Sequence, residues 1–244
     1  MKTKTTFLLL SILLFAITAC NNNGPVQLIK FSGMKGNVKM VKEFVYGATE
    51  KFGEVVPGEL DNVYIYEYDK KGNQTVYSAY NDEGVCTYKM ESIFDDRVLE
   101  SQIIYVKATD SKTENRVIER GEDYCTWLCD IGTDEQYTMT VYYYGEFTKS
   151  VDADGNVLTD IAYDSKGRLI DQMLYSDGEL FYRLFQKFDK DNNVIEVTNF
   201  IPDGGELVMT YSYPEYDKKG NWITQYTWID GEVTNVTKRE ITYR

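Results

Sequence analysis

A short turn-forming sequence recurs through this chain and constrains its fold more than any other feature. In each copy an aromatic or apolar residue is followed by Asp, two variable residues, and Gly or Asn, as in Tyr216–Asn221. The Asp side chain can bond its own backbone, and Gly or Asn tolerates a positive φ, so each copy has the composition of a tight turn between antiparallel strands. The other copies are residues 68–73, 151–156, 163–168 and 188–193, with a shortened one at 94–97.

The spacing of these turns, together with simpler Asp-Gly turns, leaves room for one strand between neighbours. Successive turns are 12 to 14 residues apart within each half of the chain. A strand with its share of a turn needs about a dozen residues, whereas a βαβ unit needs roughly 30. The spacing therefore predicts an antiparallel meander without crossover helices. The Asp residues that mark the spacing are Asp69, Asp82, Asp95, Asp152, Asp164, Asp177, Asp189, Asp203, Asp217 and Asp230.

The segments between the turns alternate as strands do. In residues 63–69 three tyrosines share one face, while Val63, Ile65 and Glu67 share the other. Both faces of many segments carry aromatic residues, and the chain contains 21 Tyr and 11 Phe. A sheet with one solvated face would not need so many. We therefore expect either a sheet that curls to bury one side, or a partly wet second face covered by tyrosines.

The pattern Tyr-Asp-x-x-Gly-Asn/Arg followed by an apolar residue, as in residues 163–169, resembles the YD repeat of RHS-type proteins and of small lipoproteins from Bacteroidetes-type bacteria. The resemblance covers about residues 60–97 and 150–244, so the irregular middle, about 99–149, is expected to be an insertion or a degraded part of the array. Large members of that family wrap many repeats into a shell, whereas four or five hairpin pairs are evident here. The expected fold is all-β: an antiparallel meander of repeated β-hairpins forming a long twisted, open or partly curled sheet.

The first twenty residues predict export and lipid attachment. Lys2 and Lys4 precede an apolar core, and residues 17–20 (Ile-Thr-Ala-Cys) resemble a lipobox ending at Cys20, the predicted lipidation site. An ordinary signal peptide that happens to contain a cysteine is the alternative. The chain is thus divided into a lipoprotein signal peptide (1–19), a flexible tether (20–34) and a single β domain (35–244). Because Asn21 is not the Asp that retains some lipoproteins at the inner membrane, we expect an outer-membrane lipoprotein, with its periplasmic or surface face undetermined.

Charge and residue content exclude several classes of function. The formal net charge is −13, which disfavours nucleic acid because its binders need a basic surface. The chain has no histidine, which excludes His-based triads and HExxH metal sites. Zinc is disfavoured because Cys86, Cys125 and Cys129 lack a fourth evident ligand, and their disulfide state stays open.

The repeated acidic residues suggest calcium or carboxylate chemistry, but turn stabilisation is the preferred interpretation. Residues 189–193 carry side-chain oxygens at alternate positions, yet the Gly and terminal Glu of an EF-hand loop are not in register. With 39 Asp and Glu residues, two carboxylates will always lie close together somewhere, so such a pair does not by itself indicate a hydrolase. We therefore expect no metal, no cofactor and no enzymatic activity, with a carboxylate-based hydrolase as a remote alternative.

The strongest binding candidate is an aromatic row in residues 221–229. Trp222, Tyr226 and Trp228 share one face at period two, a spacing that suits stacking on sugar rings or contact with a protein. The alternative is that the row is the core face of the last strand pair. YD-repeat proteins are often described as sugar-binding, so the resemblance implies a non-catalytic cell-envelope binding module for glycan or protein. A structural or assembly module, or one that neutralises a toxin, is the alternative function.

Overall fold

The computed structural model describes residues 34–202 and 204–244, and the regular elements of this part are all β-strands. The signal peptide, Cys20 and nearly all of the tether lie outside the described residues. Within the described part, no helix is long and apolar enough to cross a membrane. The strands are β1 Val38–Lys51, β2 Glu54–Tyr68, β3 Gln74–Asn81, β4 Cys86–Asp95, β5 Val98–Val106, β6 Ser111–Arg120, β7 Tyr124–Cys129, β8 Tyr137–Tyr144, β9 Phe147–Asp152, β10 Val157–Tyr163, β11 Leu169–Ser176, β12 Glu179–Phe188, β13 Val194–Ile201, β14 Gly205–Tyr216, β15 Trp222–Ile229 and β16 Glu232–Tyr243.

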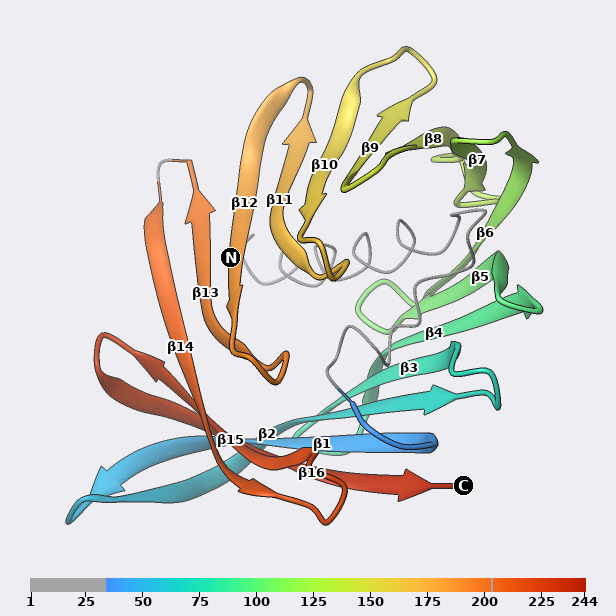
Figure 1. Cartoon of the computed structure of the whole chain (residues 1–244). Helices are drawn as coiled ribbons and strands as arrows, with labels where there is room; N and C mark the ends of the chain where they lie inside the picture. Colours follow the sequence, from blue (N-terminus) through green and yellow to red (C-terminus); the bar gives the residue numbers. More distant parts are fainter. Residues whose placement is uncertain (1–33, 203) are drawn as a thin grey trace.

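The strands form a closed barrel in which each pairs with its neighbours in sequence (Figure 1). The barrel closes because β1 pairs antiparallel with β16, from Val38 opposite Tyr243 to Gly47 opposite Asn235. The all-β class is confirmed, but the expected open or partly curled sheet is wrong. Closure satisfies the backbone groups of the first and last strands, which an open sheet would leave as exposed edges.

The strand count explains why closure was not expected. Residues 99–149, in which the sequence pattern is irregular, contribute most of β5 together with β6, β7, β8 and the start of β9, all paired with their neighbours. Residues 124–130, whose pattern fits either a strand or a helical turn, contain strand β7, Tyr124–Cys129. The barrel therefore has sixteen strands, a number at which closed barrels are well known.

Polar side chains lock the seam between β1 and β16. Glu43 and Arg239 are direct partners in the register, with Nη2 2.6 Å from Oε1, and their side chains are only 13% and 12% exposed. The last copy of the repeated turn adds a second lock. Asn221 accepts a hydrogen bond from the Lys35 backbone N–H (2.6 Å) and donates one to the Lys35 carbonyl (2.8 Å). Residues more than 180 positions apart are thereby held together.

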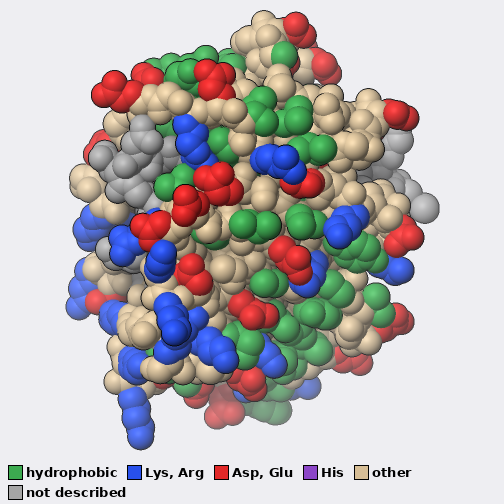
Figure 2. Space-filling model, turned by 90° about the vertical axis from the view of Figure 1, so that its right-hand side faces the viewer, with side chains coloured by type: hydrophobic (Ala, Val, Ile, Leu, Met, Phe, Trp, Pro, Cys, Tyr) green, Lys and Arg blue, Asp and Glu red, His purple; other side chains and the backbone are tan. Residues whose placement is uncertain are grey.

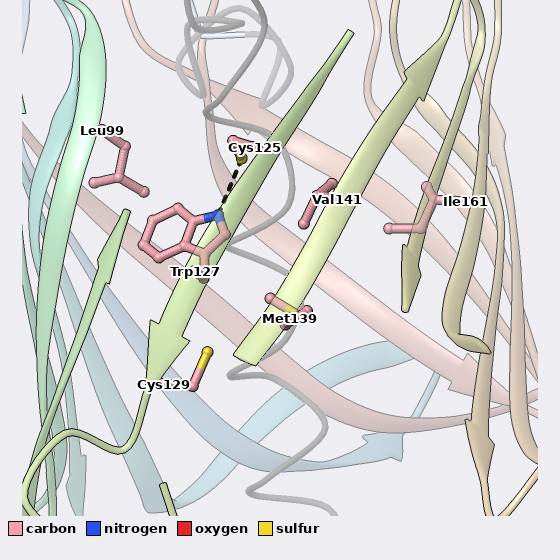
Figure 3. Close-up of a cluster of buried hydrophobic side chains, with 7 residues drawn as sticks. All are labelled: Leu99, Cys125, Trp127, Cys129, Met139, Val141 and Ile161. Atoms are coloured by element: carbon pink, nitrogen blue, oxygen red, sulfur yellow. Dashed lines mark hydrogen bonds between the residues drawn. The ribbon is translucent and has the colours of Figure 1, made fainter. Parts of the chain in front are cut away.

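The two faces of the wall differ in chemistry. Side chains on one face are buried, and apolar and aromatic ones lie there beside polar ones such as Gln102, Ser150 and Gln172. A cluster of buried hydrophobic residues from β5, β7, β8 and β10 surrounds Trp127, whose indole N–H donates to the Cys125 sulfur (3.2 Å; Figure 3). Side chains on the other face are more exposed, and basic and acidic residues lie among hydrophobic ones there (Figure 2). We call the buried side the inner face and the exposed side the outer face.

The repeated turns share one hydrogen-bond pattern, which confirms their predicted role. In each, one carboxylate oxygen of the Asp accepts the backbone N–H groups two and four residues on, at 2.8–3.0 Å. Except at Asp217, the second oxygen accepts the side chain of the residue four positions on, which is Asn or Arg168. The Asp residues are Asp69, Asp152, Asp164, Asp189 and Asp217.

Most of these turns lie at one rim of the barrel and bond to one another. Copies 68–73, 163–168, 188–193 and 216–221 follow even-numbered strands, so they share a rim, whereas 151–156 follows β9 and lies at the other. Asn73 donates to the Asp96 carbonyl of the next turn at its rim (2.8 Å), and Arg168 donates to the Asn192 side chain (3.1 Å). These bonds tie adjacent hairpins together at their ends.

Candidate functional site

The predicted aromatic row lies on β15, between β14 and β16. Register shifts interrupt the regular alternation on both sides of this strand, including one around Pro214, a residue that cannot donate to the sheet ladder. Trp222 is buried, with 7% of its surface exposed, whereas Tyr226 and Trp228 are half-buried. The three rings therefore lie in two different settings.

Trp222 belongs to the seam. The guanidinium of Arg239 lies 3.2 Å from the centre of its ring system, and the ring of Tyr213 lies 5.3 Å away. Arg239 is also the partner of Glu43, so Trp222 covers a charge pair that joins the two ends of the chain. A cation stacked on an indole is attracted more strongly when it is shielded from water, and breaking a buried charge pair is costly because the remaining charge loses its partner. The contacts of Trp222 thus match the core alternative.

Tyr226 and Trp228 form a separate, partly exposed pair. Their ring centres are 6.5 Å apart at an angle of 74°, and the Trp228 indole N–H donates to the Ser212 hydroxyl (3.0 Å). The register places both next to residues of β14, with Tyr226 opposite Ser212 and Trp228 opposite Thr210. An edge-to-face pair with one anchored indole presents a fixed aromatic surface. The predicted contact with glycan or protein is therefore restricted to this pair.

A group of tyrosines lies beside the seam on the inner face. The ring of Tyr77 is 5.2 Å from that of Tyr66 and 5.7 Å from that of Tyr88, and the Tyr66 hydroxyl donates to Glu43 (3.3 Å). Burial raises the pKa of all three tyrosines, and the Glu43 carboxylate raises that of Tyr66 further. They are therefore neutral hydrogen-bond donors at physiological pH. The sequence pattern identified part of this group, because it places Tyr64 and Tyr66 on one face.

Gln172 on β11 is a polar group on the inner face that sequence reasoning did not single out. Its side chain is fully buried, and neither amide atom has a hydrogen-bond partner. In the register it lies between Ile161 of β10 and Leu184 of β12, which are both buried. A buried amide without partners lowers stability. A lone Gln in a strand carries no sequence signal that distinguishes a buried side chain without partners from an exposed side chain.

The turn aspartates are occupied by structural hydrogen bonds. For Asp217, burial alone would raise the carboxyl pKa, but the Tyr243 hydroxyl and the backbone N–H groups of Asn221 and Lys219 outweigh it and hold the pKa below its usual range. No group of three or more Cys, Asp or Glu residues in the described chain is arranged to hold a metal ion. The hydrogen bonds that the Asp carboxylates accept within each turn agree with the preferred interpretation of these residues as turn formers.

The three cysteines within the described residues are free thiols, so the structure contains no disulfide among them. Cys125 and Cys129 are buried on β7, and Cys86 on β4 is partly exposed. Burial raises the pKa of the Cys129 thiol to about 12. A thiol with such a high pKa is protonated and a poor nucleophile.

Comparison with known proteins gives a structural relative and no family. No protein-family model matches the chain, and no curated protein matches it. Among solved structures, a porin-like protein from Bacteroides uniformis superposes with a TM-score of 0.50 at 14% sequence identity, covering 84% of this chain and 98% of that one. At this identity the likeness concerns the fold alone. It supports the assignment to closed β-barrels, a class that is compatible with a cell-envelope or outer-membrane location.

Proposed function

We propose that this protein is a non-catalytic, lipid-tethered barrel of the cell envelope, whose outer wall lies in water and serves as a binding surface. The observation that carries the proposal is a set of four ion pairs on the outer face, three of which lie away from the strand ends, while Lys187–Glu196 lies near the end of β12. The predicted lipidation of Cys20 supplies the membrane attachment that such a wall would not provide. The proposal keeps the binding role expected from the sequence and assigns it to a closed barrel.

The ion pairs lie on β4 and on the neighbouring strands β9 to β13. Lys149 and Asp160 are direct partners across β9 and β10, with Nζ 3.8 Å from Oδ2. Lys187 and Glu196 are direct partners across β12 and β13, 2.7 Å apart. The outward direction of Lys149 follows from its two sequence neighbours, which are both buried. Such partly exposed pairs contribute little to stability in water, so they indicate the surroundings of the wall more than its strength.

A wall in contact with lipid would carry a different pattern. Membrane barrels have an apolar outer band about 25 Å tall, and a Lys or Arg at its middle costs about 2–4 kcal/mol. Here Arg183 and Asp171 form a further pair on β12 and β11 (2.7 Å), and Lys89 and Glu91 form one on β4. With charges at these positions on β4 and on β9 to β13, no uninterrupted apolar band remains. The pattern supports a wall surrounded by water.

A transmembrane pore is the second candidate. It is favoured by the strand number, because barrels of sixteen strands form porins, and by the likeness to the porin-like protein. In a pore the outer ion pairs would face the hydrocarbon of the bilayer, where the cost of taking each charge out of water must be offset. The two candidates thus make opposite predictions about what touches the outer face.

The deciding experiment places a fluorescent reporter on that face. Phe185 is an exposed residue of β12 close to the Arg183–Asp171 pair, so Phe185→Trp adds an indole to the outer wall. The full chain is reconstituted with phospholipids brominated on their acyl chains, which quench indoles that contact them. We expect no more quenching than in the wild type, and no conductance steps in planar bilayers. Strong quenching of the added indole together with stepwise conductance would refute the proposal and support the pore.

The binding role is tested separately with a glycan array. Specific glycan hits that are lost in Trp228→Ala would support sugar recognition by the Tyr226–Trp228 pair. A pull-down from envelope extracts that yields one protein partner without any glycan signal would instead support the assembly or toxin-neutralising function.

A further inference from the structure

Phe52 occupies the tip of the hairpin that joins β1 and β2, and its side chain is as exposed as in an isolated residue, at 106%. Phe52 and Gly53 both have positive φ angles, 56° and 82°, as required by the two-residue turn between partners Lys51 and Glu54. A phenylalanine is unfavourable in this conformation, and its exposed ring gains nothing from burial. An Asp or Asn at this position would avoid both the unfavourable backbone conformation and the exposed apolar ring.

The chain uses ordinary turn residues wherever else the same situation arises. Among the described residues, every other non-glycine with a positive φ is Asp or Asn. The hairpins at Asp177-Gly178 and Asp230-Gly231 repeat the geometry closely, with φ of 53° at each Asp and 79° and 81° at the glycines. Phe52 is therefore a local exception in a chain that otherwise follows the rule. An unfavourable residue at an exposed tip points to a role outside folding.

The hairpin that carries Phe52 stands free of the barrel. Pairing of β1 with β16 ends at Gly47, and pairing of β2 with β3 begins at Asn62, so the ribbon between them is paired only with itself. Figure 1 shows this ribbon projecting from the barrel. At its base a Cβ on Gly58 would lie 3.1 Å from the Gly47 carbonyl oxygen, within a stretch where the register shifts twice. A side chain at Gly58 would therefore crowd the Gly47 backbone where the ribbon leaves the wall.

The charges around the tip distinguish between possible occupants. Residues 48–61 contain four acidic side chains, Glu50, Glu54, Glu59 and Asp61, and one basic side chain, Lys51. Segments that insert into membrane surfaces combine apolar residues with Lys and Arg, because bilayers carry anionic lipids. An acidic tip is repelled by such a surface. It complements instead a protein pocket that accepts an aromatic ring and has basic residues at its border.

We propose that the β1–β2 ribbon is a docking element, and that Phe52 inserts into an apolar, basic-rimmed pocket of a partner protein. The ring acts as the anchor of the contact, in the manner of the buried aromatic residues that dominate many interfaces. Glu50 and Glu54 pair with the rim and give the encounter a dependence on salt. This surface is separate from the Tyr226–Trp228 pair, so the inference does not depend on glycan binding.

The test begins with a photo-crosslinking phenylalanine analogue at position 52 of the full chain, expressed in its native host, with the same analogue at Asp177 as the control tip. The partner protein that crosslinks to position 52 and not to position 177 is then purified. Its affinity is measured for the wild type, for Phe52→Asn, and for Glu50→Gln/Glu54→Gln. We expect Phe52→Asn to weaken binding about tenfold or more. We expect the double variant to weaken binding as well and to reduce its salt dependence.

Stability and lipid contact complete the test. Asn is favoured in this turn, so Phe52→Asn should unfold at the same or a higher urea concentration than the wild type. A lower midpoint would assign Phe52 a folding role and overturn the proposal, as would unchanged affinity for the captured protein or the absence of a specific crosslink. Quenching of Phe52→Trp by brominated lipids would place the tip in a membrane. Because Phe185→Trp reports on the wall and Phe52→Trp on the tip, the two proposals fail independently.

Discussion

The turn at Asp164 offers the most direct test of what stabilises this barrel. One of its carboxylate oxygens accepts the backbone N–H groups of Lys166 (2.9 Å) and Arg168 (3.0 Å), and the other accepts the Arg168 Nε–H (2.7 Å). The guanidinium also reaches Asn192 in the next turn, 3.1 Å away, and lies 4.4 Å from the centre of the Phe188 ring. Removing the carboxylate therefore affects two hairpins.

The magnitude follows from these bonds. A hydrogen bond to a charged group contributes about 1.5–3 kcal/mol, but the side chains of Asp164 and Arg168 are 21% and 15% exposed, so water replaces part of what is lost. For Asp164→Ala we expect a loss of about 2–4 kcal/mol in the free energy of unfolding. Asp164→Asn keeps an oxygen for the two backbone groups and loses the charge pairing, so we expect about 1–2 kcal/mol.

The assay is urea unfolding followed by tryptophan fluorescence, with Asp177→Asn as the matched control. Asp177 also lies in a hairpin turn and loses the same charge, but its carboxylate accepts only a long hydrogen bond from Ser176 (3.4 Å). The control should stay within about 0.5 kcal/mol of the wild type. If Asp164→Ala and Asp164→Asn also stay within that range, the repeated Asp does not stabilise the turn and our account of the repeat is wrong.

The stability difference between the wild type and the Asp164 variants should also depend on pH. Burial alone would raise the pKa of Asp164, but the bonds from Arg168 and from the Lys166 backbone outweigh it and keep the folded-state pKa below its usual value. A depressed carboxyl pKa stabilises the folded state above the unfolded-state pKa of about 3.9, and this stabilisation is lost as the pH falls through the folded-state value. The difference between the wild type and Asp164→Ala should be constant near neutral pH and shrink below about pH 4. A difference that grows on acidification would contradict the assignment.

Three further predictions concern the seam, the aromatic strand and the inner face. Glu43→Gln should lower the unfolding free energy by about 3–5 kcal/mol because it leaves Arg239 buried without its partner, whereas Glu43→Leu/Arg239→Met should cost less than either single change in urea unfolding. Trp222→Ala should cost about 3–5 kcal/mol, while Trp228→Ala should cost clearly less and leave a folded barrel by circular dichroism; equal losses would contradict their separation. Gln172→Met should raise the unfolding midpoint, by about 1–2 kcal/mol of stability, because it removes an unpaired buried amide; a lower midpoint would mean that the amide has a partner.

Local features of this fold could be predicted from the sequence because they depend on a few adjacent residues. The Asp, Gly and Asn residues of the repeated turns determine each reversal through bonds that span four positions, so their spacing predicted the succession of hairpins. Strand faces followed from simple alternation, as for Tyr64 and Tyr66. The register shift near Pro214 has a similarly local cause, since proline cannot donate to the sheet ladder.

Closure could not be predicted in the same way, because it depends on residues far apart in the chain. Glu43 and Arg239 carry no local signal that they will be partners, and their pairing also decides the position of Trp222. The aromatic row failed as a continuous surface for a related reason. Period-two spacing assumes an uninterrupted strand, whereas the bulges beside β15 place its first ring at the seam and the other two in a half-exposed setting.

The two rims of the barrel differ in a way that bears on function. The chain enters β1 at the rim where most of the repeated turns lie, and the last of these turns binds the backbone of Lys35. That rim is thus rigidly bonded and lies next to the predicted tether. The opposite rim carries simpler Asp-Gly turns and the free ribbon with Phe52. Because β1 has 14 residues and rises about 3.3 Å for each, its tip lies roughly 45 Å along the strand from its first residue. If the predicted tether holds the barrel at one rim, the ribbon with Phe52 lies at the other rim, so the proposed docking contact would be made away from the attachment point.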